Sequence, residues 1–475
     1  MVSEPGAPRT TRWVPLALVA LALLLRLRGL ITFPLEQDEL YTVQEATQLF
    51  RTTLKPGISG RPLYYLLEHV LLAAGPATPL LLRLPPLLFG LAGVWATWRL
   101  GARLFGVTAG WVAGLLVAIS PWHLYMSGFA RYWSLVYLLV TLLFLCLAVA
   151  ASTDRSRDYA GAAATGILGS LTHPTFLFAG LGAALGAQLV MPDGTFGWRW
   201  PSRRAWRWLW GPWAAVLVAG YAVLRLTGQV GALRNFQGRG LLATLRLLPA
   251  MVQWTTPTVC AAGGMGALLL LALRERPAWR RFGAMALVGI ASTTVLLFVL
   301  ATRTDVYADY GIAMLPLVFV ASGALVALGA EQMVRGGGWF AAAAATVIAA
   351  GVLPSTVSHL SDGTRFDYRP ALRAVAATAP TVPVLTWPIV IGRYYAPGLD
   401  NRELDLHPEA LDAALGAAGD LWVILSVREY GLVGDDTGQG SAWLATHCRP
   451  VLTHQGVRLD SRVYRVELER CRKVP

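Results

Sequence analysis

Charged residues are scarce in this chain of 475 residues: Asp, Glu, Lys and Arg together make up 14% of the sequence. A typical soluble domain carries roughly 25%. Hydrophobic residues make up 55%, and the mean hydropathy is +0.52. This composition excludes a disordered chain, a fibrous chain and an ordinary soluble enzyme, and it predicts a protein that crosses a membrane several times.

Lysine is almost absent, because Lys55 and Lys473 are the only two lysines among 40 basic residues. Codon bias in a GC-rich genome explains this preference for arginine. Phosphate binding, which suits the forked guanidinium group, is the functional alternative. The formal net charge of +13 is spread over short loops and forms no basic domain, so we expect no nucleic acid as a partner.

Cysteine is also rare, with four residues, which excludes a fold built on disulfides. Cys146 and Cys260 lie inside apolar runs, where we expect buried thiols. Cys448 and Cys471 lie outside every apolar run and could pair if the C-terminal region faces an oxidising compartment. No spacing of Cys and His residues predicts a zinc site, and we assign no metal ligands.

The apolar runs predict the membrane topology. A spanning helix needs about 20 mostly apolar residues, and about eleven segments approach this length. The first runs into Arg26 and Arg28 without a cleavage site, so we expect a span rather than a signal peptide. The basic loops place the N-terminus inside and the C-terminus outside. The segments lie near 13–33, 80–104, 107–126, 133–151, 159–172, 174–191, 209–226, 257–274, 282–301, 310–330 and 338–356.

Two polar segments are too long to be turns. Residues 34–79 are predicted to form an outer loop, with amphipathic helices over 39–50 and 62–74 that lie on the membrane surface. Residues 358–475 are predicted to form a small extracytoplasmic α/β domain. Its expected strands are 382–387, 421–427, 451–454 and 463–468, and its expected helices are 368–379, 408–417 and 441–447. The predicted fold is therefore a multi-span α-helical membrane domain, residues 1–357, followed by this domain.

Unusual polar residues gather at helix ends on the predicted outer side, where carboxylates, an arginine and histidines together could form a reaction site. They are Asp38, Glu39, His123, Arg131, Tyr132, His173, Asp305 and Asp309. Each also has a purely structural explanation. Asp38 suits a helix N-cap, Arg131 beside Tyr132 suits an interface anchor, and His173 could bond to a carbonyl at a helix end. The remaining residues suit an interface or a solvated loop.

Short motifs around these residues recur in a particular order along most of the chain. They are Gln37-Asp38-Glu39, Arg61-Pro62-Leu63-Tyr64-Tyr65, Leu82-Arg83-Leu84-Pro85, Ser120-Pro121-Trp122-His123, Ala130-Arg131-Tyr132, Leu171-Thr172-His173, Asp309-Tyr310 with Leu315-Pro316, and Asp367-Tyr368-Arg369. The ordered set resembles the bacterial GT-C glycosyltransferases. Within them, it is most similar to the branch that contains glycosyltransferase family 39, the protein O-mannosyltransferases and the aminoarabinose transferase of lipid A.

Two positions depart from the pattern of that family. Gly60-Arg61-Pro62 stands where the family usually has His-Pro-Pro, and Asp309 stands where it usually has arginine. A carboxylate at position 309 would repel a phosphate. We therefore expect Arg61, Arg303 or an arginine of the 225–246 region to supply the missing positive charge.

The resemblance implies a membrane glycosyltransferase that moves a sugar from a polyprenyl phosphate to an acceptor hydroxyl outside the cell, with inversion. It implies Asp38 as the base, with Glu39 beside it. It implies Arg131, His173 and Arg61 as ligands of the lipid phosphate. Tyr64 and Tyr132 are also expected to bind substrate. The expected substrate-binding residues are therefore Arg61, Tyr64, Arg131, Tyr132 and His173.

The expected partners are the lipid-linked donor, a lipid, glycan or protein acceptor, and membrane lipids. No nucleotide is expected, because nothing resembles a Gly-rich phosphate loop; no cofactor is required, and a divalent metal at the carboxylates stays open. The C-terminal domain is expected to cover the site and select the acceptor. Its aromatic and arginine side chains could stack on sugars or be ordinary core residues: Trp387, Arg393, Tyr394, Tyr395 and Trp422.

Two other functions stay open. A polysaccharide ligase or polymerase would use a lipid-diphosphate glycan and predicts a long late outer loop rich in Arg and His. A non-enzymatic lipid or glycan transporter would tolerate Asp38→Asn. An ion-coupled transporter is disfavoured, because the apolar runs hold few charges and no matching pair of broken helices. The expected location is the bacterial plasma membrane, with the active site and the C-terminal domain extracytoplasmic.

Overall fold

The computed structural model describes residues 13–49, 61–226, 245–302, 306–333, 335–428, 431–435, 437–455 and 464–473. The chain divides into two compact units, and each is described here by itself. The helical unit comprises Met1–Leu27, Ala46–Gly75 and Arg83–Thr356, and the mixed-sheet unit comprises Arg28–Glu45, Pro76–Leu82 and Val357–Pro475. The predicted domain boundary at 357/358 stays a prediction.

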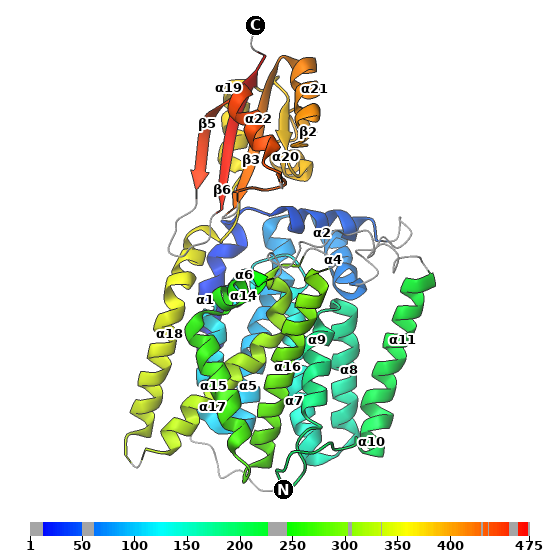
Figure 1. The fold of residues 1–475 in the computed structure, drawn as a ribbon, viewed down its shortest axis with the longest axis vertical. Coiled ribbons are helices and arrows are strands. Elements are labelled where there is room, and N and C mark those ends of the chain that lie inside the picture. Colours follow the sequence, from blue (N-terminus) through cyan, green and yellow to red (C-terminus); the bar gives the residue numbers. More distant parts are fainter. Residues whose placement is uncertain are drawn as a thin grey trace. The chain divides into compact units, whose positions relative to one another are not determined.

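Helices account for most of the described residues of the helical unit. They are α1 (Val14–Ile31), α4 (Pro62–Ala74), α5 (Pro79–Ile119), α6 (Pro121–Ser127), α7 (Trp133–Thr153), α8 (Ser156–Thr172), α9 (Phe176–Gly186), α10 (Arg203–Ala205), the π-helix η2 (Trp206–Trp210), α11 (Gly211–Leu226), α14 (Leu247–Thr255), α15 (Pro257–Ala272), α16 (Pro277–Ala301), the 3-10 helix η3 (Ala308–Met314), α17 (Leu315–Glu331) and α18 (Gly337–Asp362). In Figure 1, α4 and α6 lie at one end of this bundle and α10 at the other.

The chain is a multi-pass membrane protein, as its composition predicts. All eleven predicted apolar segments fall on helices. Among the described residues, six helices are long and apolar enough to cross a membrane, or seven if α14 and α15, bent by 92°, form one span. Several others are shorter than predicted: α8 has 17 residues, α9 has 11 and α11 has 16. The predicted second span and most of the third are consecutive parts of α5, separated by a kink at Gly106, where φ is 87°. The third was predicted to reach residue 126, but α5 ends at Ile119 and α6 follows.

Small residues let the long helices approach closely. Gly182 and Gly186 of α9 lie four residues apart, and therefore on one face of the helix, toward α16. A Cβ atom would lie 3.0 Å from the Val288 carbonyl oxygen at the first position and 2.6 Å from the Ala284 carbonyl oxygen at the second. The Ser292 hydroxyl of α16 donates to the Phe178 carbonyl of α9 at 2.6 Å. Such close backbone contact replaces the hydrophobic driving force that lipid-facing helices lack.

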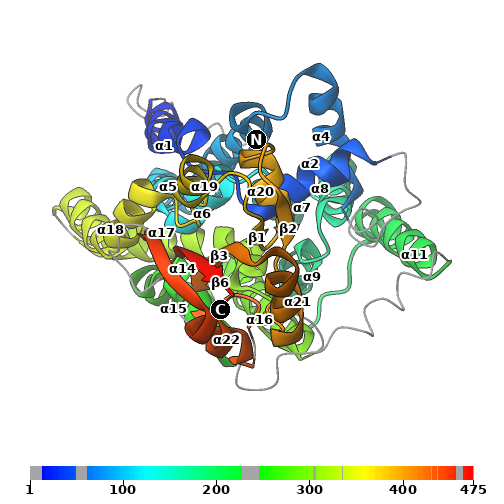
Figure 2. The same cartoon turned by 90° about the horizontal axis from the view of Figure 1, so that it is seen from above.

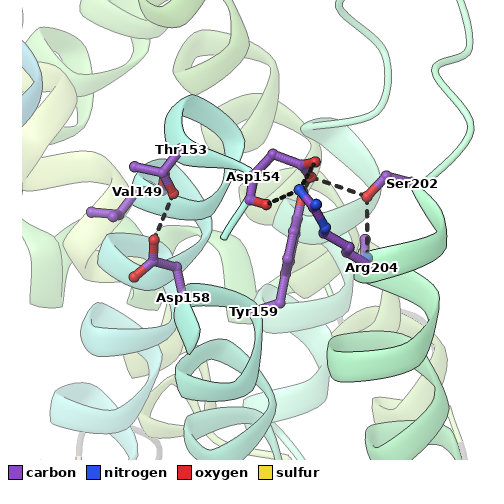
Figure 3. A network of polar contacts seen from close by, with 8 residues as sticks. Val149, Thr153, Asp154, Asp158, Tyr159, Ser202 and Arg204 are labelled. Atoms are coloured by element: carbon purple, nitrogen blue, oxygen red, sulfur yellow. Dashed lines mark hydrogen bonds and ion pairs between the residues drawn. The ribbon is translucent and has the colours of Figure 1, made fainter. Parts of the chain in front are cut away.

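A polar network closes the end of the bundle where α7 meets α8 and α10 (Figure 3). Asp154, in the left-handed conformation after α7, accepts hydrogen bonds from the Tyr159 hydroxyl at 3.0 Å and the Ser202 hydroxyl at 3.1 Å. The Arg204 guanidinium donates to its carboxylate at 3.2 Å. These bonds fix the chain between the helices; the ion pair is exposed and contributes little, about 0–1 kcal/mol.

The mixed-sheet unit has an α/β fold with one six-stranded sheet. Its strands are β1 (Val384–Thr386), β2 (Asn401–Glu403), β3 (Asp420–Arg428), β4 (Gly431–Leu432), β5 (Cys448–Gln455) and β6 (Arg465–Arg472). Their order is β2-β1-β3-β6-β5, with β4 paired to β3. The pairs β1–β2 and β1–β3 are parallel, whereas β3–β6 and β5–β6 are antiparallel. The helices are α2 (Gln37–Thr47), α19 (Arg369–Thr378), α20 (Ile389–Tyr395), α21 (Pro408–Ala418) and α22 (Gln439–His447).

Helices cover both faces of this sheet, as Figure 2 shows with α19 and α20 on one side and α21 and α22 on the other. The alternation along β3 matches this arrangement. Leu421, Val423 and Leu425 share an apolar core with residues of α21 and α22. On the opposite face, the Ser426 hydroxyl is hydrogen bonded to the Tyr368 hydroxyl at 2.6 Å, just before α19. All four predicted strands and all three predicted helices are present; the short α20, β2 and β4 were not predicted.

Cys448 and Cys471 form a disulfide, which the sequence left open. The two residues are direct partners in the antiparallel β5–β6 pair. Cys471 is fully buried in the core that α21 and α22 cover. The bond therefore ties the outermost strand of the sheet to its neighbour.

Removing this disulfide should destabilise the mixed-sheet unit. The cysteines are 23 residues apart, and closing a loop of that length is worth about 3–4 kcal/mol of unfolding free energy. The double variant Cys448→Ala/Cys471→Ala should therefore unfold at lower denaturant concentration, measured by proteolysis of the full chain in increasing urea. Cys146→Ala/Cys260→Ala is the matched control, and equal urea midpoints for both double variants would contradict the prediction.

Candidate functional site

The turn between α6 and α7 presents Arg131 and Tyr132. Ser120 begins α6 as its N-cap, with its hydroxyl accepting from the His123 N–H at 3.3 Å, and Pro121 occupies the first helical position. After α6 ends at Ser127, the Arg131 N–H bonds to the Phe129 carbonyl at 2.6 Å, and α7 begins at Trp133. The turn is tight and buried, so both side chains have fixed positions.

His173 lies at the break between α8 and α9. Its backbone N–H still bonds to the Gly169 carbonyl, but Pro174 follows and the helix ends. The imidazole Nδ1 atom accepts from the Thr175 backbone N–H at 3.2 Å and is bonded to the Thr175 hydroxyl at 2.7 Å. The side chain is therefore held by the next turn rather than by a free helix carbonyl.

Tyr132 is the centre of a group of aromatic and basic side chains from four parts of the helical unit, which we call the Tyr132 cluster. Its ring stacks on the His173 ring at 4.6 Å between centroids and meets the Tyr64 ring edge-on at 6.1 Å. The guanidinium carbons of Arg61 and Arg131 lie 4.8 and 5.6 Å from its centroid. The full cluster consists of Arg61, Tyr64, Tyr65, Arg131, Tyr132, Trp133, His173 and Tyr310.

All five residues that the sequence predicted to bind substrate lie in this cluster. Tyr65 and Tyr310 join them: the Tyr65 hydroxyl accepts from Arg131 at 3.1 Å, and the Tyr310 ring lies 5.7 Å from that of His173. Arg131 is 8% exposed and His173 is 3% exposed. The cluster thus holds two guanidinium groups next to one aromatic ring; of the two arginines, Arg131 is buried and Arg61 is half-buried.

His173 is neutral, unlike the two arginines of the cluster. Its Nδ1 atom accepts a backbone N–H, so the ring proton sits on Nε2. Burial lowers the pKa of His173 well below its usual range, and the charges of Arg61 and Arg131 lower it further. His173 therefore offers a hydrogen-bond donor rather than a cation. Arg61 and Arg131 carry the positive charge, and their forked geometry suits phosphate oxygens.

The two predicted catalytic carboxylates belong to the mixed-sheet unit. The helix α2 begins at Gln37, so Asp38 is a half-buried residue of its first turn and not its N-cap. Its backbone carbonyl accepts from the Thr42 hydroxyl at 3.0 Å. Glu39 is fully buried, and its Oε2 atom accepts from the Arg365 Nη1 group at 2.7 Å and the Glu36 N–H at 3.0 Å. Glu39 thus fixes the start of α2, including the neighbouring Asp38.

Replacing Glu39 with Gln should destabilise the mixed-sheet unit. The side chains of Glu39 and Arg365 are 0% and 1% exposed, and removing one partner of such a buried pair costs about 3–5 kcal/mol. The double variant Glu39→Gln/Arg365→Met should recover part of this loss, because no buried charge is left uncompensated. Denaturant unfolding of both variants tests this, and an unchanged Glu39→Gln midpoint would disprove it.

Other predicted residues lie elsewhere. The His123 Nδ1 atom accepts from the Arg26 guanidinium at 2.8 Å, and the His123 ring contacts Tyr137 at 4.4 Å between centroids, so His123 belongs to a different buried network. Asp309 lies in the first turn of η3, next to Tyr310 of the cluster. Asp305, Arg303 and most of the 225–246 region lie outside the described residues. Trp422 is 1% exposed and packs under Arg470, so it is a core residue and not a sugar platform.

The sequence alone did not identify Arg365 as the partner of Glu39 or Arg26 as the partner of His123. Arg365 lies near the start of the C-terminal segment, and Arg26 lies inside an apolar run; neither falls in a recognisable motif. Their burial, at 3% exposed each, is the signal that identifies them. Within the described ranges, no group of three or more His, Cys, Asp and Glu side chains could hold a metal ion.

Comparison with known proteins supports the fold by structure alone. No protein-family model matches the sequence, and no curated protein is similar to it. The fold is that of ArnT. The crystal structure of ArnT from Cupriavidus metallidurans in the apo state has a TM-score of 0.54 at 15% identity, covering 96% of this chain and 98% of that chain. The same protein bound to undecaprenyl phosphate has a TM-score of 0.54 at 14% identity, with the same coverage.

A more distant similarity is to the archaeal oligosaccharyltransferase AglB from Archaeoglobus fulgidus, in complex with an inhibitory peptide and a dolichol-phosphate. Its TM-score is 0.47 at 12% identity, over 87% of this chain and 70% of that chain. The predicted resemblance to the GT-C glycosyltransferases is therefore confirmed at the level of the fold, through ArnT.

Proposed function

We propose that this protein is a glycosyltransferase that moves a sugar from a polyprenyl phosphate to an extracytoplasmic acceptor hydroxyl, with inversion. The observation that carries the proposal is the Tyr132 cluster, in which Arg61 and Arg131 lie within 6 Å of one tyrosine ring. It occurs in a chain with the fold of ArnT, a protein whose crystal structure was obtained with undecaprenyl phosphate bound.

The cluster suits a phosphate that becomes a leaving group. As the bond from sugar to phosphate breaks, negative charge grows on the phosphate oxygens, and fixed cations in a dry site stabilise it most. Arg61 and Arg131 supply that charge, and the Nε2–H group of His173 supplies a neutral donor. Arg61 also compensates for Asp309, which stands where the family usually has arginine.

Asp38 is the proposed base. The acceptor hydroxyl must lose its proton as it attacks the anomeric carbon, and a positioned carboxylate accelerates this step by about 10²–10⁴-fold. Asp38 lies in the first turn of a helix that Glu39 fixes through Arg365. The proposal assigns Glu39 a positioning role and requires Asp38 to reach a sugar bound at the Tyr132 cluster.

The disulfide supports the proposed orientation. Disulfides persist in oxidising compartments and are rare in the bacterial cytoplasm. The bond between Cys448 and Cys471 therefore favours a mixed-sheet unit on the outer side of the plasma membrane. Both candidate carboxylates, Asp38 and Glu39, belong to that unit.

A transfer assay tests the function. The purified chain in lipid nanodiscs is given polyprenyl-phosphate sugars labelled with ¹³C, together with lipid, glycan and protein fractions from a strain that lacks the gene. Mass spectrometry then follows the label. We expect the label in one acceptor fraction, and polyprenyl-diphosphate glycans should not replace the donor.

Three outcomes would contradict the proposal. Label transfer only from diphosphate-linked glycans would favour a ligase or polymerase. Movement of labelled lipid across vesicles without transfer would favour a transporter. Full transfer by the Arg61→Ala/Arg131→Ala double variant would remove the Tyr132 cluster from the reaction.

A further inference from the structure

The mixed-sheet unit contains a pocket that the proposed chemistry does not use. The pocket has a volume of about 590 Å³ and lies between α19 and α20, extending to the loop after α20. This volume falls within the range of small-molecule sites, roughly 300–1,000 Å³. Its lining residues are Arg369, Leu372, Arg373, Ala376, Tyr395, Ala396, Gly398 and Leu399.

Two arginines line this pocket, and one of them, Arg369, is held in place before any ligand arrives. Arg369 is bound by Asp367 through its Nε and Nη2 atoms, both at 2.8 Å, which leaves its Nη1 group outside that pair. The Arg373 Nε atom donates to the Arg369 carbonyl at 3.2 Å, so both of its terminal nitrogens are outside that bond. A guanidinium group that is fixed like that of Arg369 loses less entropy on binding an anion.

Apart from the two arginines, the pocket is lined by small and aliphatic residues and by one tyrosine, Tyr395, whose position is fixed. The Tyr395 hydroxyl is hydrogen bonded to the backbone of Leu35, as donor to its carbonyl at 3.2 Å. Its ring therefore keeps one orientation at the pocket. Leu372 and Leu399 provide further apolar surface. A fixed aromatic ring beside aliphatic groups suits the C–H face of a sugar ring, whereas the arginines suit a negative group on the same molecule.

We propose that this pocket binds an anionic saccharide, that is, a sugar that carries a phosphate or a carboxylate group. The arginines bind the anionic group, and Tyr395 with Leu399 contacts the ring. If the proposed function holds, this ligand is part of the acceptor, and the pocket selects it; that role rests on the proposed function, whereas the binding itself does not.

A neutral sugar does not fit the observations equally well. It would bring no anion to Arg373 or to the Nη1 group of Arg369, although both residues line the cavity. Inorganic phosphate alone would leave Tyr395 and the leucines without contact in a cavity of about 590 Å³. The saccharide part and the charged part of the ligand therefore make separate, testable contributions.

Two variants isolate the pocket, and each has a matched control. Arg373→Gln removes one guanidinium group; Arg402→Gln, whose guanidinium is exposed and paired with Asp400, is its control. Gly398→Leu fills the cavity, because a Cβ atom there meets nothing within 4 Å. Gly416→Leu on α21 is its control, since a Cβ atom at Gly416 also meets nothing within 4 Å.

Saturation-transfer NMR on the full chain in detergent micelles measures binding of glucose 1-phosphate, glucuronic acid, glucose and inorganic phosphate. We expect at least one anionic sugar to bind about tenfold or more tightly than glucose and than phosphate. Arg373→Gln and Gly398→Leu should each weaken this binding about tenfold or more, because a charge-assisted contact or the space for the ring is lost. The control variants should bind as the unmodified chain does.

Preference for the phosphate or the carboxylate sugar would identify the anionic group. Equal binding of glucose, equal binding of phosphate alone, or unchanged binding in both pocket variants would overturn the proposal. These measurements need no donor and no turnover. Failure of the transfer assay with intact binding therefore contradicts the proposed function alone, and loss of binding specificity with intact transfer contradicts the pocket alone.

Discussion

Replacing Asp38 with Asn should lower kcat by about 10²–10⁴-fold, the contribution of a positioned base, and leave the affinity for the donor unchanged. Asn has the shape of Asp and keeps the first turn of α2, but it cannot accept a proton from the acceptor hydroxyl. The change leaves the ion pair between the neighbouring Glu39 and Arg365 in place. The unfolding midpoint of the variant is measured as well, so that an effect on the rate is separated from an effect on stability. The measurement is single-turnover transfer of labelled sugar, with donor binding followed separately.

The matched control is Asp400→Asn, which removes an exposed carboxylate of the same unit that is paired with Arg402. It should transfer sugar at the normal rate. Full turnover by the Asp38→Asn variant, together with a normal unfolding midpoint, would exclude Asp38 as the base. A loss of turnover together with a lower unfolding midpoint would point to misfolding, and Asp38→Glu then decides, because it should restore part of the rate if a carboxylate is required.

Most of the fold could be predicted from the sequence, because local pattern determines it. Apolar runs fix where membrane helices form, and the His173-Pro174 pair fixes the break between α8 and α9. The apolar pattern alone overestimates the length of some helices. For example, α9 ends at Gly186 although apolar residues continue beyond it. The strand β2 escaped prediction because its three residues, Asn401–Glu403, are polar and pair only at the sheet edge.

The candidate site was predictable to the extent that its residues lie in ordered motifs. Arg131-Tyr132 and His173 were found in this way, and the structure brings them together. Partners that meet only in three dimensions were not found. Glu39 and Arg365 are 326 residues apart, and Arg26 and His123 are 97 apart. The neutral state of His173 also depends on tertiary structure, because burial and then the charges of Arg61 and Arg131 lower its pKa.

Replacing Arg131 with Ala should weaken binding of the polyprenyl-phosphate donor by roughly 10³-fold. A guanidinium about 4 Å from a phosphate oxygen contributes about 4 kcal/mol at an effective dielectric near 20, and each 1.4 kcal/mol is tenfold in affinity. Arg131 is 8% exposed, so solvent screens this charge weakly. Arg61 lies against the same Tyr132 ring and should retain part of the binding. The Arg61→Ala/Arg131→Ala double variant should therefore bind the donor more weakly than either single variant.

The conservative variant Arg131→Lys separates charge from geometry. Lysine keeps the positive charge but lacks the fork that donates to Tyr65 at 3.1 Å and that, in the proposed function, would bond to two phosphate oxygens. Its donor affinity should therefore fall between that of the unmodified chain and that of the Arg131→Ala variant, and its dependence on salt should match that of the unmodified chain. If Arg131→Ala bound donor normally while Arg61→Ala did not, Arg131 would be only a membrane-interface anchor, and the phosphate would have to be bound by Arg61 alone.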